Sequence, residues 1–162
     1  MKKILIAMFV LFFGLTITPA AKAQVSVQVN IGSQPAWGPT GYDYAPYYYF
    51  PDYNIYFDVS SNKYIILNNN SWIYVSSVPA RYRFDPYSAY KVVIKQSKPY
   101  RYNQTHIRAY AKYKGQGSKQ PMIRDSKDEK YFESKQHPQH NQWEKTHSQQ
   151  KNVKKQAKGN KK

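Results

Sequence analysis

Hydrophobic and polar residues follow a period of two in several strand-length segments of this chain. Residues 25–31 alternate Val and Ile with Ser, Gln and Asn, and residues 53–58, 63–67, 72–76 and 90–95 are rich in aromatic and β-branched side chains. This period is typical of strands, because successive side chains point to opposite faces of a sheet. The pattern therefore predicts five strands.

Short polar gaps separate the central strands. Residues 59–62 and 68–71 contain asparagine, which accepts the left-handed backbone that tight hairpin turns need. Residues 99–113 instead place Tyr102, His106 and Tyr110 on one side at helical spacing, which predicts a helix packed on the sheet. The predicted fold class is mainly β, a small α+β domain with an antiparallel β-meander of about four to five strands and one or two short helices.

The start of the chain predicts export. Lys2 and Lys3 precede an apolar run over residues 4–17, and Ala21-Lys22-Ala23 supplies small residues for cleavage. This arrangement is typical of a signal peptide, here residues 1–23. The apolar run is shorter than the roughly 20 residues that span a bilayer. We therefore expect no transmembrane anchor after cleavage, and a periplasmic or secreted protein.

Composition divides the remaining chain into two parts. Residues 24–113 hold 16 of the 17 tyrosines and form the predicted Tyr-rich β-meander domain. Residues 114–162 carry isolated apolar residues and contribute +8 to the formal net charge of +16. Such a segment buries too little apolar surface to offset its conformational entropy, which predicts a basic, largely disordered tail. A capping pattern at Ser126 to Glu129 predicts a short helix over 127–135 as the alternative for its middle part.

The concentration of aromatic rings allows more than one interpretation. A domain of about 90 residues hides only roughly 60 to 65 % of its unfolded surface, so some rings should face solvent. Rings paired across strands would stabilise the sheet. Exposed rings would instead stack on sugars or unpaired bases, or anchor an envelope protein. The candidate ligand-binding residues of this aromatic face are Tyr47, Tyr48, Tyr49, Tyr56, Trp72 and Tyr74.

Lysines dominate the end of the chain. In a flexible segment they bind polyanions by releasing counterions, without sequence specificity. Outside the cytoplasm, partners of this kind are anionic polysaccharide, lipopolysaccharide and extracellular DNA. A tail that only improves solubility is the alternative. The candidate polyanion-binding residues are Lys151, Lys154, Lys155, Lys158, Lys161 and Lys162.

Catalytic and metal-binding patterns are weak. Asp52 and Asp58 would lie about 20 Å apart along a strand, whereas a paired acid and base sit roughly 5 to 10 Å apart. The chain has no cysteine, and a metal-chelating cluster of His137, His140 and His147 is a minor alternative because no acidic partner follows at regular spacing. The sequence predicts a non-enzymatic protein with no cofactor and no metal site.

Several stretches are distinctive together: the YYYFPDYNIYFDV block (47–59), the SWIY and YKVVI segments that follow it, and the PMIRDSKDEKYF block (121–132). With them the chain resembles a family of small tyrosine-rich proteins that Gram-negative bacteria export. The resemblance implies an extracytoplasmic location and one compact domain. It leaves open whether the PMIRDSKDEKYF block belongs to that domain, and it brings no activity, ligand or catalytic residue.

These observations favour an exported, non-enzymatic interaction protein of the envelope or the medium. The basic tail and the exposed aromatic face would bind anionic envelope polymers. The alternative is a periplasmic carbohydrate-binding or assembly accessory module that uses the aromatic face of the sheet alone.

Overall fold

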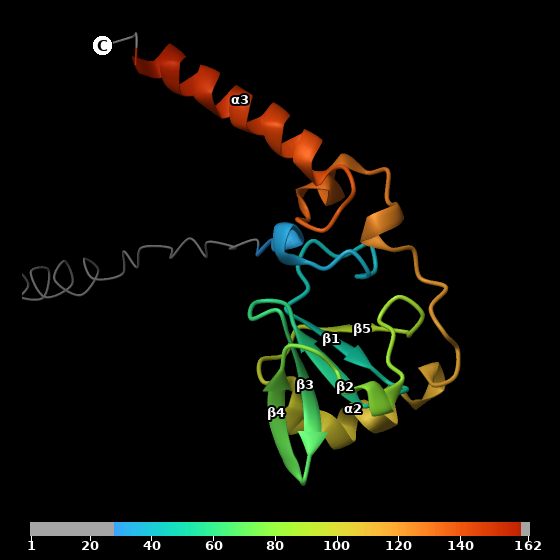
Figure 1. Ribbon diagram of the computed structural model, residues 1–162. Coiled ribbons are helices and arrows are strands. Elements are labelled where there is room, and N and C mark those ends of the chain that lie inside the picture. Colours follow the sequence, from blue (N-terminus) through green and yellow to red (C-terminus); the bar gives the residue numbers. More distant parts are fainter. Residues whose placement is uncertain (1–27, 160–162) are drawn as a thin grey trace, which may run out of the picture.

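Five antiparallel strands form one sheet in the computed structural model, which describes residues 28–159. Strands β1 to β4 form a meander, and β5 pairs with the outer side of β1, so the order across the sheet is β4-β3-β2-β1-β5 (Figure 1). The predicted mainly β, small α+β fold class is confirmed. The strands are β1 (Tyr47–Phe50), β2 (Ile55–Asp58), β3 (Lys63–Asn68), β4 (Ser71–Val75) and β5 (Val92–Ile94).

Asparagines form the turns between the strands. Asn62, between β2 and β3, has a φ of 54°, and the two-residue loop Asn69-Asn70 between β3 and β4 has φ values of 45° and 63°. A left-handed backbone at both central positions is the geometry of a type I′ hairpin turn, whose twist matches that of the strands. The two turns predicted from these asparagines are confirmed.

The predicted helix over residues 99–113 is present as three short segments: η3 (Pro99–Tyr102) and η4 (Ala111–Tyr113), which are 3-10 helices, and α2 (Asn103–Ala109) between them. The buried residues of the segment are Pro99 of η3 and Asn103 and His106 of α2. Tyr102, which we expected on the packed side, is 46 % exposed. The reason is that a 3-10 helix has three residues per turn, so η3 breaks the α-helical phase on which the prediction was based.

One face of the sheet, here called the Trp37 face, is covered by the loop that precedes β1. The Trp37 ring centroid lies 5.2 Å from that of Tyr48 and 4.9 Å from that of Phe57, both in edge-on geometry. Phe84, from the connection between β4 and β5, packs edge-on against Phe50 at 4.8 Å. These contacts form the larger of the two cores beside the sheet.

The opposite face, here called the helix face, lies beneath α2 (Figure 1). Tyr49, Tyr56 and Ile65 are fully buried there, and Tyr110 packs against them from the end of the helical segment. Tyr49 and Tyr56 are directly opposite each other in β1 and β2, with ring centroids 4.7 Å apart. The sheet is therefore buried on both sides, which explains why β1 contains four consecutive aromatic residues with no polar alternation.

Residues beyond 113 also belong to the compact part of the chain, where the sequence predicted a disordered tail. Ile123 of η5 (Ile123–Asp125) and Tyr131 of η6 (Glu129–Glu133) form a third buried cluster with Ile31. These apolar residues are isolated in the sequence but meet in space. The short helix expected over 127–135 is the five-residue 3-10 helix η6.

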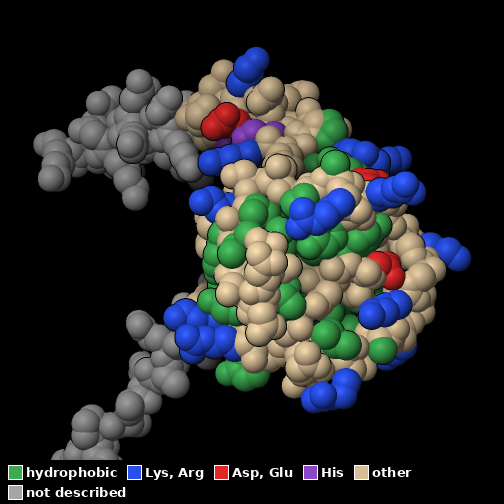
Figure 2. All heavy atoms as spheres, turned by 60° about the horizontal axis from the view of Figure 1, so that its bottom comes forward, with side chains coloured by type: hydrophobic (Ala, Val, Ile, Leu, Met, Phe, Trp, Pro, Cys, Tyr) green, Lys and Arg blue, Asp and Glu red, His purple; other side chains and the backbone are tan. Residues whose placement is uncertain are grey.

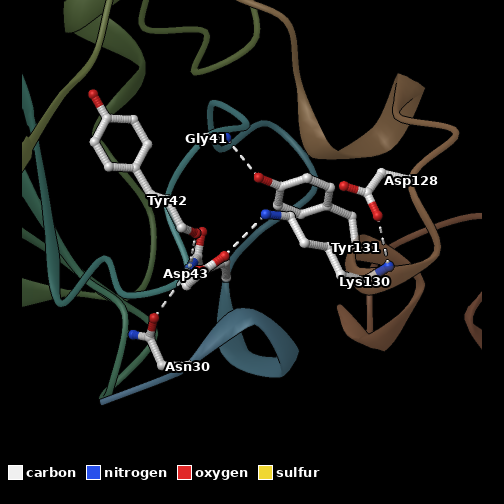
Figure 3. Close-up of polar contacts among 8 residues, drawn as sticks. Asn30, Gly41, Tyr42, Asp43, Asp128, Lys130 and Tyr131 are labelled. Carbon is white, nitrogen blue, oxygen red and sulfur yellow. Dashed lines mark hydrogen bonds and ion pairs between the residues drawn. The ribbon is translucent and has the colours of Figure 1, made fainter. Parts of the chain in front are cut away.

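Polar contacts fasten η6 to the loop before β1 (Figure 3). The Nζ of Lys130 lies 3.0 Å from a carboxylate oxygen of Asp43, and the hydroxyl of Tyr131 accepts a hydrogen bond from the Gly41 N–H at 2.5 Å. The surface ion pair contributes little, because solvent screens exposed charges. The Tyr131 ring, which is buried, and its hydroxyl contact add to this attachment.

The beginning of the chain differs from the prediction of a strand over 25–31. Residues 28–30 are irregular, and η1 (Ile31–Ser33) is a 3-10 turn. The Asn30 side chain replaces a strand ladder here: its Nδ2 donates to the Ala45 carbonyl at 3.0 Å and its Oδ1 accepts from the Ala45 N–H at 2.9 Å. Residues 25–27 and the predicted signal peptide, residues 1–23, lie outside the described residues.

The last element, α3 (His140–Gly159), is a 20-residue helix in the segment predicted to be largely disordered. Gln, Lys, Glu and Ala are good helix formers, and no proline interrupts the segment. It meets the rest of the protein at η6 and extends away from the sheet (Figure 1). Within residues 28–159, no helix combines the length and apolar character needed to cross a membrane.

Candidate ligand-binding groove

The six rings predicted as a ligand-binding face do not share one exposed surface. Tyr48 points to the Trp37 face, and Tyr49 and Tyr56 are buried on the helix face. Because α2 covers the ring-rich side of the sheet, the broad stacking platform that we considered from the sequence is not formed. These three rings stabilise the core instead.

A buried polar network joins α2 to the sheet. The Tyr56 hydroxyl accepts from Asn103 Nδ2 at 3.0 Å and shares a second hydrogen bond of 2.9 Å with Nδ1 of His106. Asn103 Nδ2 also donates to Asn54 Oδ1 at 2.6 Å. Burial lowers the pKa of His106 and raises that of Tyr56, which favours the neutral forms of both groups. Tyr56, Asn103 and His106 are buried and Asn54 is half-buried, so the network stabilises the contact between α2 and the sheet.

The remaining rings lie near the edge of the sheet, where a groove opens between β4 and η3. Its volume is about 330 Å³. Trp72 and Tyr100 line the groove, and their ring centroids are 6.1 Å apart. Tyr102, the last residue of η3, lines it as well. Tyr74 is 44 % exposed and contacts Tyr100 edge-on at 6.5 Å, beside the groove. Tyr47 is half-buried and is not among the lining residues.

Polar groups surround these rings. Arg101 lines the groove, is exposed, and forms no ion pair within the described part of the chain. Asn70, Gln104 and Thr105 add amide and hydroxyl groups at the rim. No carboxylate of the described residues lines this groove. The site therefore offers stacking, hydrogen bonding and one positive charge.

Two larger hollows lack this combination. One, of about 500 Å³, is lined mostly by residues of the loop 116–121 and a single ring, Tyr90. The other, of about 610 Å³, lies between η6 and α3 and contains Phe132 and Trp143, but the carboxylate of Glu129 also lines it. A negative charge at that position opposes an anionic ligand, so the groove beside β4 is the better candidate.

Sequence reasoning found Trp72 and Tyr74 but missed Tyr100, Arg101 and Tyr102. The helical pattern assigned these three residues to a packed helix, whereas η3 turns them toward the edge strand. Pro99 at the first position of η3 was a signal for a separate helical turn. Partial burial, with Tyr100 nearby, raises the pKa of Tyr74 to about 12, so its hydroxyl is neutral at physiological pH.

The remaining candidate residues have structural contacts. Asp58 accepts from Ser60 in the turn after β2 at 2.6 Å, and Asp52 accepts from the Gly115 N–H at 2.6 Å. His137 and His140 bond to backbone carbonyl groups of Ser126 and Phe132. Among the described residues, no group of three or more His, Asp or Glu side chains could hold a metal ion.

The predicted polyanion-binding lysines lie at the end of the chain. Lys151, Lys154, Lys155 and Lys158 belong to α3, and Lys161 and Lys162 lie outside the described residues. Comparison with known proteins found no matching family model, no similar curated protein and no similar solved structure.

Proposed function

We propose that this chain is an exported, non-enzymatic protein that binds anionic polymers of the cell envelope. The observation that carries the proposal is the groove beside β4, which Trp72, Tyr100 and Tyr102 line together with Arg101, a residue without an ion pair among the described residues. Aromatic faces stack on sugar rings, and a guanidinium group binds carboxylate or phosphate through two parallel hydrogen bonds. An anionic sugar unit satisfies both parts of this site.

Long-range electrostatics support the same ligand class. The chain carries +16, and removal of Lys2, Lys3 and Lys22 with the predicted signal peptide leaves +13. On the side of the molecule that Figure 2 shows, Lys and Arg side chains surround exposed hydrophobic patches and acidic side chains are few. Positive charge attracts a polyanion from a distance, and the groove supplies the short-range contact.

A second candidate function is a module that binds neutral carbohydrate, or assists assembly, through the aromatic groove alone. The amide and hydroxyl groups of Asn70, Gln104 and Thr105 favour it, because they can bond sugar hydroxyls without any charge. The two candidates differ in their response to salt. Binding by released counterions weakens steeply with ionic strength, whereas stacking and neutral hydrogen bonds do not.

A salt titration of binding tests the proposal. The purified protein is applied to immobilised lipopolysaccharide, to an acidic exopolysaccharide and to a neutral glucan between about 50 and 200 mM salt, a range over which six cation contacts to a polyanion weaken binding by roughly a thousandfold. We expect retention on both anionic polymers to fall steeply and the neutral glucan to bind weakly. Retention that is unchanged by salt, or a preference for the neutral glucan, contradicts the electrostatic proposal.

Substitutions separate the two parts of the site. Replacing the six C-terminal lysines by glutamine should reduce the salt dependence, and Trp72→Ala should weaken binding at every salt concentration. Tyr42→Ala is the matched control, because Tyr42 is an exposed ring outside the groove. A Trp72→Ala protein that binds like the Tyr42→Ala protein would exclude the groove from the function.

A further inference from the structure

The two edges of the sheet are protected differently. On the β5 side, the side-chain amide of Gln120 covers the backbone of Lys91, the residue before β5, accepting from its N–H at 3.0 Å and donating to its carbonyl at 2.9 Å. The outer side of β4 has no such cover within residues 28–159. The only strand paired with β4 there is β3, and no other segment forms a backbone hydrogen bond with Trp72 or Tyr74. Unpaired edges recruit other strands unless charge, proline or a covering segment prevents it.

The register of the β3–β4 hairpin shows which groups are free. Asn68 and Ser71 flank the two-residue turn, so they form a hydrogen-bonded pair, and the bonding then alternates along the strand. Residues 71, 73 and 75 direct their N–H and C=O groups toward β3. The N–H and C=O groups of Trp72 and Tyr74 therefore point outward, at the open edge.

The side chains of this edge are also unusual for a basic protein. Residues 71–79 contain no charged residue, although the chain carries +16. Ile73 is 36 % exposed on the Trp37 face and Tyr74 is 44 % exposed on the helix face. The lysine, proline or bulge with which natural proteins usually protect an edge is missing from β4 itself.

We propose that the open edge of β4 pairs with β4 of a second copy of this chain, antiparallel and with the twofold axis at Ile73. In this register Trp72 is opposite Tyr74 of the second copy, and Tyr74 is opposite Trp72 of the second copy. Both are hydrogen-bonded pairs, so four backbone hydrogen bonds form from the four outward residues. Ile73 is opposite its own copy, and each Trp–Tyr pair adds a cross-strand aromatic contact.

A second copy is the occupant that the charge distribution favours. Two chains of the same positive sign repel each other over most of their surfaces, and β4 is an uncharged edge strand at which they can meet. The strand is also self-complementary. Under twofold symmetry, Trp72 and Tyr74, whose backbone N–H and C=O groups point outward, are opposite each other in the two copies. An acidic partner strand would find no matching cation on residues 71–79.

The buried area predicts a weak dimer. Pairing of two five-residue strands buries less than the roughly 1,200 Å² of a stable interface, so the association should depend strongly on concentration. Its response to salt should be opposite to that of polyanion binding: screening reduces the repulsion between copies, so dimerisation increases with ionic strength.

Such a dimer has a ten-stranded sheet with both helix faces on the same side, because the twofold axis is perpendicular to the sheet. Both β4 grooves then open on that side. If the proposed function is correct, two grooves on one side would bind a repeating polymer with increased avidity. The dimer itself does not depend on that function.

Disulfide trapping tests the register directly, because the chain has no cysteine. In Ile73→Cys the two cysteines form a non-hydrogen-bonded pair with Cα atoms about 4.5 Å apart, within the Cα range that a disulfide spans. The control is Asn69→Cys, in the exposed β3–β4 turn, where the proposed register separates the two thiols by roughly 26 Å at 3.3 Å per residue. Both proteins are oxidised with copper phenanthroline at low and high salt.

We expect Ile73→Cys to form a covalent dimer at least about tenfold faster than Asn69→Cys, with a higher yield at high salt. Equal rates for the two variants would overturn the proposal. In sedimentation, Ile73→Lys should abolish the reversible dimer, while Val29→Lys, which adds the same charge at an exposed aliphatic residue far from β4, should not. Normal dimerisation of Ile73→Lys would also overturn it. Polymer binding measured on these variants reports on the proposed function separately.

Discussion

Lys91 is a buried amine, and its replacement by methionine should stabilise the protein. Its side chain is 1 % exposed, and its Nζ donates to Ser118 Oγ at 3.3 Å. Burial lowers the pKa of this lysine to about 8, although the negative charge of Asp85 acts in the opposite direction. Lys91→Met keeps the aliphatic part of the side chain and removes the charge.

The magnitude follows from the pKa change. A decrease from 10.5 to about 8 corresponds to a destabilisation of at most about 3.4 kcal/mol when the lysine is charged, at about 1.36 kcal/mol per pH unit. Loss of the hydrogen bond to Ser118 removes about 1 kcal/mol of stabilisation. We therefore expect Lys91→Met to raise the free energy of unfolding by about 2 kcal/mol at pH 7.

The pH dependence of unfolding separately tests whether the charge on buried Lys91 destabilises the fold. Because the folded-state pKa is below the unfolded-state value, the unfolded chain binds more protons between about pH 8 and 10.5, and wild-type stability gains from Lys91 as pH rises through this range. The difference between the variant and the wild type should therefore decrease from pH 8 to pH 10. Urea unfolding followed by circular dichroism measures both proteins, with exposed Lys95→Met as the control. A Lys91→Met protein less stable than wild type at pH 7, or a difference independent of pH, refutes this reasoning.

Three further changes test other parts of the fold by the same unfolding assay. Burial lowers the pKa of His106, so its contribution to stability is present above about pH 6.5 and should be lost as pH falls through the lower folded-state value; stability unchanged between pH 7 and 5 contradicts this. Asn70→Gly should stabilise the β3–β4 turn by a few tenths to about 1 kcal/mol, since Asn70 has a φ of 63°, whereas a loss of stability would exclude the I′ turn. Ile123→Ala should reduce stability by about 2 to 5 kcal/mol if residues beyond 113 are part of the fold, while a change below about 0.5 kcal/mol supports the detached tail expected from the sequence.

The sequence predicts the parts of this fold that depend on local chemistry. Asn62, Asn69 and Asn70 mark turns because their side chains tolerate the left-handed backbone, and strands β2 to β5 follow from aromatic and β-branched segments. Strand β1 was missed because a strand buried on both faces has no alternation to recognise. The attachment of residues 121–135 stayed open at the level of the sequence because Ile123 and Tyr131 find their partner, Ile31, only through the tertiary fold.

The candidate site shows the same limit. Sequence reasoning identified an excess of tyrosine and expected some rings to be exposed, and Tyr74 and Tyr102 are exposed. It could not choose which rings remain at the surface, because α2 decides that by covering Tyr49 and Tyr56. Arg101 was missed because the change from 3-10 to α geometry after Tyr102 alters the direction in which neighbouring side chains point.

In the proposed function, Trp72 and Arg101 bind the polymer together at a single groove of a positively charged protein. The most direct test is the dissociation constant for an acidic polysaccharide, measured at fixed moderate salt for wild type, Trp72→Ala/Arg101→Gln and the control Tyr42→Ala. We expect the double variant to bind at least about tenfold more weakly, since a stacked ring and a charge-assisted hydrogen bond each contribute roughly 1 to 3 kcal/mol, and the control to bind like wild type. Equal dissociation constants for all three proteins would contradict the account.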